Sequence, residues 1–113
     1  MALQRTFTRN GFSADYLHFF RFDEMDHDQR RCVAIFSLWK DAATYAAEPN
    51  DPWIPRAVRL TLIGDKFDQW VSKATIAGPP ALDITAQVYL AAKVEPVEYW
   101  GGQLANMAEA EDI

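Results

Sequence analysis

The densest group of side chains that could do chemistry in this 113-residue sequence lies at positions 23–28. It holds four carboxylates and one imidazole: Asp23, Glu24, Asp26, His27 and Asp28. Hard cations such as Ca²⁺ bind several carboxylate oxygens on a flexible loop, which needs a glycine for its tight turn. Because this segment contains no glycine, we expect a solvated hairpin turn there and no metal site.

Two further residues could act as a base or as a nucleophile. His18 stands in an aromatic segment, and the sequence identifies no partner of the kind that a general base needs, so we expect a half-buried structural histidine. Cys32 is the only cysteine, which excludes an internal disulfide and fits a reducing compartment. It opens an apolar run, where a thiol behaves as a small hydrophobe. Arg30 and Arg31 precede it, but neighbouring strand residues point to opposite faces, so an activated thiolate is not expected.

The sequence has no P-loop, no dinucleotide-binding glycine motif, no Gly-x-Ser-x-Gly, no His-Glu-x-x-His and no cysteine pair for zinc. Its five glycines leave little room for a phosphate-binding loop. We therefore predict no catalytic residue, no cofactor and no metal. The alternative is a small cytoplasmic enzyme or regulator of unknown substrate, for which His18, Asp23 and Cys32 are the candidate residues.

The elements that position these residues are predicted from hydrophobic patterning. Strands are expected at residues 3–8, 15–25, 32–39 and 57–63, and residues 32–39 are apolar on both faces, as in a central strand. The second and third strands form an antiparallel hairpin around the polar residues 26–29. Within residues 15–25 the alternation is imperfect, because apolar residues fall on both faces: Tyr16, His18, Phe20 and Phe22 on one, and Leu17, Phe19 and Met25 on the other.

The second half of the sequence is predicted to be helical, with Asp65 and Asp83 as N-caps of two helices. Residues 40–48 fit either a helix or an extended strand, and residues 49–55, with three prolines, form a loop. The predicted fold class is α+β: an antiparallel sheet or small sandwich of about four strands, followed by two short helices. We expect a single domain at residues 1–95 and a C-terminal tail at 96–113 that docks or frays.

Charge and composition narrow the function classes. The net charge is −5, and the excess of acidic residues lies entirely beyond position 60, whereas a nucleic-acid partner requires a basic surface. No apolar run reaches the roughly 20 residues that a membrane-spanning helix needs, and the N-terminus lacks the apolar segment of a secretory signal. We expect neither a nucleic-acid nor a membrane partner.

Large apolar residues stand at the breaks between elements. Trp53 and Ile54 lie between prolines, and Tyr99 and Trp100 precede a Gly-Gly pair. Tyr and Trp are enriched at protein–protein contacts, because a large apolar body is combined with one hydrogen-bonding group. These four residues are the predicted interface anchors. The alternative is that they cover the domain's own core.

The order of these segments resembles small structural proteins from the tail and baseplate modules of tailed bacteriophages and prophages. The resemblance rests on the strand that follows Met1-Ala2-Leu3, the Asn10-Gly11 turn before Tyr16-Leu17-His18-Phe19, the segment Ser37-Leu38-Trp39-Lys40-Asp41, the segment Phe67-Asp68-Gln69-Trp70, and the final helix Gln87-Val88-Tyr89-Leu90-Ala91-Ala92-Lys93. It covers about three quarters of the chain. It implies a non-catalytic virion component that assembles in symmetry-related copies, and it transfers no catalytic residue.

The expected function is therefore that of an assembly protein whose partners are copies of itself and other virion proteins. The resemblance implies a location in the virion, or in the bacterial cytoplasm before assembly. A binding module for another host or phage protein, working as a monomer or dimer, is the remaining alternative.

Overall fold

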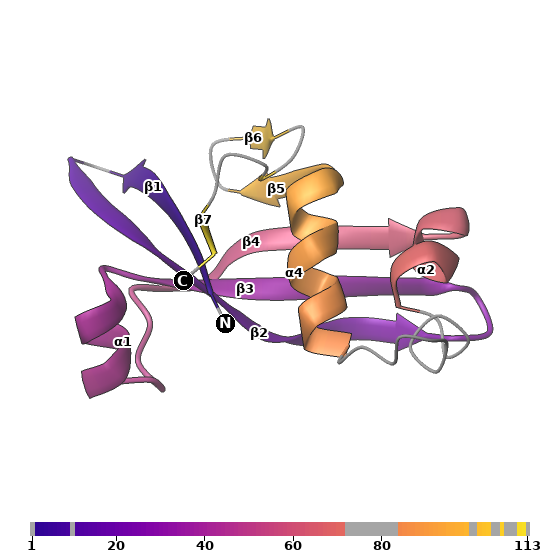
Figure 1. Ribbon diagram of the computed structural model, residues 1–113, viewed down its shortest axis with the longest axis horizontal. Helices are drawn as coiled ribbons and strands as arrows, with labels where there is room; N and C mark the ends of the chain where they lie inside the picture. The colour runs from indigo at the N-terminus through magenta and orange to yellow at the C-terminus, as the bar shows by residue number, and fades with distance from the viewer. Residues whose placement is uncertain are drawn as a thin grey trace.

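A computed structural model describes residues 2–9, 11–71, 84–99, 102–104, 107 and 111–112 of the chain. Within these residues the strands form one antiparallel sheet in the order β6-β5-β4-β3-β2-β1-β7 (Figure 1). The strands are β1 (Leu3–Arg9), β2 (Phe12–Asp26), β3 (Arg31–Trp39), β4 (Ile54–Ile63), β5 (Val97–Tyr99), β6 (Gly102–Leu104) and β7 (Glu111–Asp112). The helices are α1 (Ala42–Ala47), α2 (Asp65–Trp70) and α4 (Ile84–Val94). The α+β class and the antiparallel sheet are confirmed.

β3 is the centre of the sheet, as its two-sided apolar pattern predicts. It pairs with β2 on one side and β4 on the other, and each of its residues from Cys32 to Trp39 is buried. The predicted hairpin is confirmed, because β2 and β3 pair antiparallel around the turn at residues 27–30. The side chains of Cys32, Ala34, Phe36 and Leu38 belong to the main hydrophobic core.

The predicted face of Phe22 is wrong, because β2 contains a β-bulge. The register of β2 against β3 shifts between Phe19 and Arg21, so one extra residue is inserted and the alternation changes phase. Phe19 then pairs with Phe36 and Phe22 with Ala34, and both rings pack against the core, with their centroids 5.0 Å apart. The bulge brings Arg21 and Asp23 to the opposite face of the sheet.

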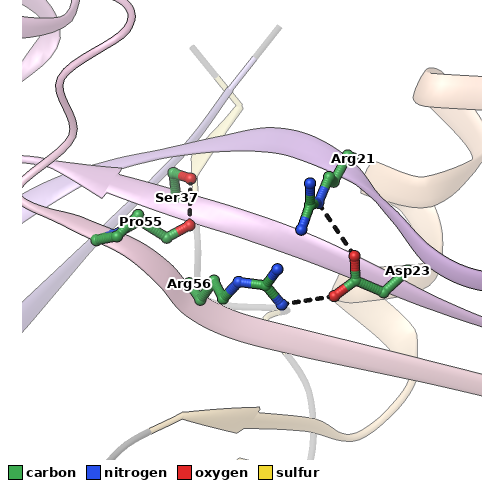
Figure 2. Close-up of polar contacts among 5 residues, drawn as sticks. All are labelled: Arg21, Asp23, Ser37, Pro55 and Arg56. Atoms are coloured by element: carbon green, nitrogen blue, oxygen red, sulfur yellow. Dashed lines mark hydrogen bonds and ion pairs between the residues drawn. The ribbon is translucent and has the colours of Figure 1, made fainter.

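On that opposite face, which we call the outer face, an ion network crosses β3 (Figure 2). Asp23 of β2 accepts from Arg21 Nε at 3.0 Å and from Arg56 Nη1 of β4 at 2.6 Å. Since β3 lies between β2 and β4, the Arg56–Asp23 pair spans the strand. The outward residues Val33 and Ile35 are consequently only 2% and 1% exposed.

The core face is covered by α4, which crosses the central strands (Figure 1). Val88, Ala91 and Ala92 are buried in the core, and the small alanines allow the helix axis to approach the sheet closely. The hydroxyl of Tyr89 accepts a hydrogen bond from the backbone N–H of Phe19, in the part of β2 beyond its pairing with β1. Met107 is buried as well, and its N–H donates to the Ala92 carbonyl at 2.9 Å.

The prediction of two helices is too low, because the segment at residues 40–48 forms the helix α1. Its N-cap is Asp41, whose side chain accepts from the Thr44 backbone N–H at 2.8 Å. This hydrogen bond is the largest of the effects that lower the pKa of the Asp41 carboxyl. The cap stabilises a helix of only six residues, which is too short for helical periodicity to show in the sequence.

The prediction of about four strands is also too low. β5 pairs with β4, β6 pairs with β5, and β7 pairs with β1, so segments from both sides of position 95 join one sheet. These strands contain two or three residues, which is too short for an alternating pattern to be recognised. β4 begins earlier than expected, at Ile54, because a register shift accommodates Pro55, whose carbonyl accepts from Ser37 Oγ at 2.7 Å (Figure 2).

The Tyr89 hydroxyl gives a direct test of how α4 is attached to the sheet. The substitution Tyr89→Phe removes the acceptor for the Phe19 N–H and leaves that donor without its partner in a partly buried position. We expect the free energy of unfolding, measured by urea denaturation, to fall by about 1–2 kcal/mol. Leu90→Ala, at an exposed position on the same helix, is the control and should change it by less than about 0.5 kcal/mol. Equal stability of Tyr89→Phe and wild type would contradict the assigned hydrogen bond.

Candidate functional site

The outer face carries a cluster of aromatic rings where α1 meets the sheet. Tyr45 of α1 is at its centre, with ring centroids 5.1 Å from Tyr16, 4.6 Å from His18 and 4.9 Å from Trp39. Trp39 also donates from Nε1 to the Glu48 carbonyl at 3.0 Å, at the end of α1. These contacts attach an otherwise exposed helix to β2 and β3.

His18 is held in one tautomer by two partners. Its Nδ1 lies 2.9 Å from the Phe19 carbonyl oxygen, which can only accept, so Nδ1 carries the proton. Its Nε2 lies 3.2 Å from the Tyr45 hydroxyl and accepts from it in the neutral imidazole. Partial burial lowers the pKa of His18 below its usual value, although the bond to the Phe19 carbonyl opposes this effect. The ring is therefore neutral at pH 7.

A cavity of about 340 Å³ lies beside this cluster, and we call it the His18 cavity. Aromatic rings and prolines form most of its wall. Its lining residues are His18, Phe19, Phe20, Ser37, Trp39, Tyr45, Pro49, Asn50, Pro52 and Pro55. None of these described lining residues is a lysine, arginine, aspartate or glutamate.

A second surface feature, the Phe12–Trp53 patch, lies where the β1–β2 hairpin meets the proline-rich loop. Its residues are Arg9, Phe12, Ser13, Lys40, Trp53 and Ile54, which line two hollows of about 250 and 150 Å³ that share Phe12 and Trp53. Phe12 is 70% exposed and Trp53 is 40% exposed. Large apolar rings from two distant segments are thus exposed side by side.

The structure brings together only part of the predicted interface set. Trp53 and Ile54 lie in the patch, although Ile54 is half-buried and also packs against the core. Tyr99 lies elsewhere, half-buried against the core with its ring centroid 5.8 Å from that of Phe7. Trp100 lies outside the described residues. Phe12 was missed by the sequence analysis, and the signal that could have found it is a phenylalanine directly after the Asn10-Gly11 turn.

The three candidate catalytic residues are kept apart. His18 and Asp23 are on the outer face, where they pair with Ser37 and Val33 of β3, four residues and roughly 13 Å apart along the strand. Cys32 belongs to the core on the other face of the sheet. Asp23 is engaged by two arginines, as described above.

The acidic segment at residues 23–28 forms turn and ion-pair contacts. The Asp26 carboxylate accepts from the backbone N–H groups of Asp28 and Gln29, at 3.0 and 3.1 Å. Glu24 pairs with Arg31 at 3.0 Å. Within the part of the chain that the structure describes, no group of three or more His, Cys, Asp or Glu residues could hold a metal ion.

Comparisons of the chain with protein-family models, with curated proteins and with solved structures found no match. The His18 cavity and the Phe12–Trp53 patch are the two surface features that point to a function. The helices among the described residues lack the length and apolar content that crossing a membrane requires.

The neutral state of His18 predicts a pH dependence of stability. The unfolded histidine has a pKa of about 6.5, and the folded value is lower, so the unfolded state binds more protons between the two values. The contribution of neutral His18 to the free energy of unfolding is fully present above pH 6.5. It is lost as the pH falls through the folded pKa.

Urea denaturation between pH 7.5 and pH 5 measures this loss, and the variant His18→Gln is the reference that lacks the titrating ring. Wild type should lose more stability than the variant over this range. An NMR titration of the His18 ring should give a pKa below 6.5. Equal losses in the two proteins would contradict the burial of a neutral imidazole.

The environment of Cys32 predicts a thiol that does not react in the folded protein. The side chain is fully buried, and this burial raises the pKa of the thiol to about 11, so almost no thiolate is present at pH 8. We expect no labelling by an aromatic disulfide reagent at pH 8 until urea unfolds the chain. The variant Ser13→Cys, at an exposed position, is the positive control and should react at once. Rapid labelling of native wild type would contradict this assignment.

Proposed function

We propose that this protein is a non-catalytic assembly subunit that contacts other copies of itself through the Phe12–Trp53 patch. The observation that carries the proposal is the exposure of Phe12 and Trp53 side by side, from segments about forty residues apart in the sequence. Exposed clusters of large apolar side chains mark interaction surfaces, and aromatic residues supply much of the binding energy there. The hollows between the two rings offer space for side chains of a neighbouring subunit.

The charge of the patch supports a second copy as the occupant. Arg9 and Lys40 flank the rings, whereas the chain as a whole has a net charge of −5. Another copy offers exposed acidic residues of the second half of the chain, such as Asp65 and Glu98. The patch would then contact a different surface of its neighbour. Contacts of this heterologous kind generate rings or filaments.

The setting that we propose is the tail or baseplate module of a tailed phage or prophage, where subunits repeat by symmetry. Other virion proteins are then further partners, and the location is the virion, or the bacterial cytoplasm before assembly. The resemblance in segment order supports this setting, and the exposed patch supports the mode of contact. No catalytic residue is part of the proposal.

Light scattering over a concentration series tests the proposed assembly. Wild type should increase in mass with concentration, and higher ionic strength should weaken the association because charge contributes to it. The double variant Phe12→Ser/Trp53→Ser should weaken association by at least about thirtyfold, which corresponds to about 2 kcal/mol for the loss of a binding hot spot.

The matched control is Ile63→Ser, which removes a large side chain with 55% exposure at the far end of β4. It should leave the association unchanged. Thermal melting of all variants shows whether the fold is kept. A wild type that stays monomeric at high concentration, or a double variant that assembles like wild type, would exclude the proposed contact.

A further inference from the structure

The His18 cavity has the character of a small-molecule site, and it is separate from the Phe12–Trp53 patch. The two features share no lining residue. The cavity volume of about 340 Å³ lies at the lower end of the range for ligand pockets, which is about 300–1,000 Å³. Its wall contains the rings of His18, Phe20, Trp39 and Tyr45 and three prolines, so a ligand would contact mainly flat apolar surface.

Three hydrogen-bond donors on the side chains of the wall already have protein partners. The hydroxyl of Ser37 donates to the Pro55 carbonyl at 2.7 Å, and Trp39 Nε1 donates to the Glu48 carbonyl at 3.0 Å. The Tyr45 hydroxyl donates to Nε2 of neutral His18. The three prolines have no backbone N–H. The donors of these side chains are therefore directed at protein acceptors.

Acceptors remain on two other lining side chains. The Tyr45 oxygen keeps a lone pair after donating its proton, and the Asn50 amide offers a carbonyl oxygen as well as an NH2 group, whereas Ser37 is fully buried. A ligand that brings its own N–H or O–H group can bond to these oxygens. A carboxylate or phosphate would lose its hydration without gaining a cation, since no charged side chain is present among the described lining residues.

From this geometry we infer that the His18 cavity binds a flat, uncharged aromatic molecule of one or two rings that carries an N–H or O–H donor. The rings of the wall supply the stacking surface, and the acceptor oxygens orient the donor. This inference does not depend on the proposed assembly. Binding at the cavity and association through the patch are measured separately.

The test uses indole as the probe, with 1-methylindole and indole-3-carboxylate as comparison ligands, and the full chain as the protein. Isothermal titration calorimetry gives the affinities, and the NMR signals of the His18 ring report contact at the cavity. Indole should bind saturably and shift the His18 signals. Methylation of the indole nitrogen removes the donor and should weaken binding at least about tenfold. The anionic carboxylate should bind more weakly than indole.

Two variants locate the binding. Phe20→Ala removes a wall ring that is 53% exposed, so the fold should be kept, and it should weaken indole binding about fivefold or more. Phe12→Ala removes an exposed ring of the patch and should leave indole binding unchanged. The inference is overturned by an absence of saturable indole binding, by equal affinity for 1-methylindole, or by a larger effect of Phe12→Ala than of Phe20→Ala.

Discussion

The burial of β3 on both faces is the constraint on which the rest of the structure depends. Eight consecutive side chains, from Cys32 to Trp39, are buried, and alternation directs half of them to each face. On the core face, α4 and the apolar residues of neighbouring strands cover them. The outer face is covered by the Arg21–Asp23–Arg56 network over Val33 and Ile35, and by the aromatic cluster of α1 over Trp39. Both coverings are needed because the sequence of β3 is apolar on both of its faces.

The charges of the ion network contribute little to the stability of the outer face. The Arg21 and Arg56 side chains are about half exposed, and exposed ion pairs contribute at most about 1 kcal/mol. Long arginine stems, however, bury apolar surface beneath them while the guanidinium group stays in water. The carboxylate of Asp23 joins the two arginines across β3, where the outward side chains of Val33 and Ile35 are buried.

Sequence patterning predicts the central features of the fold, because long apolar segments have only one way to be buried. The β2–β3 hairpin and the central position of β3 follow from it, and so does the break before β4, although β4 already begins at Ile54. The bulge after Phe19 does not, since a one-residue insertion depends on backbone pairing that the pattern of apolar residues does not encode. The six-residue helix α1 and the short strands β5 to β7 are below the length at which periodicity is detectable.

Surface features are harder to predict, because they join residues that are distant in sequence. Nothing in the sequence relates Phe12 to Trp53, or His18 to Pro49. The proline-rich segment meets α1, β2 and β3 at the cavity, and it meets the β1–β2 hairpin at the patch. The sequence predicts a half-buried His18, but the tautomer of its ring depends on Tyr45. Tyr45 lies in a segment whose sequence fits either a helix or a strand. Tyr99 and Trp53 are both predicted interface residues. Only the tertiary structure shows that Tyr99 packs against the core whereas Trp53 is exposed.

The proline-rich loop connects the two surface features physically. Pro52 and Pro55 line the His18 cavity, whereas Trp53 and Ile54 between them line the Phe12–Trp53 patch. Proline fixes the backbone angle φ, so the loop has few alternative conformations, and both surfaces are largely preformed. A preformed surface loses little conformational entropy on binding, which favours affinity at small buried area.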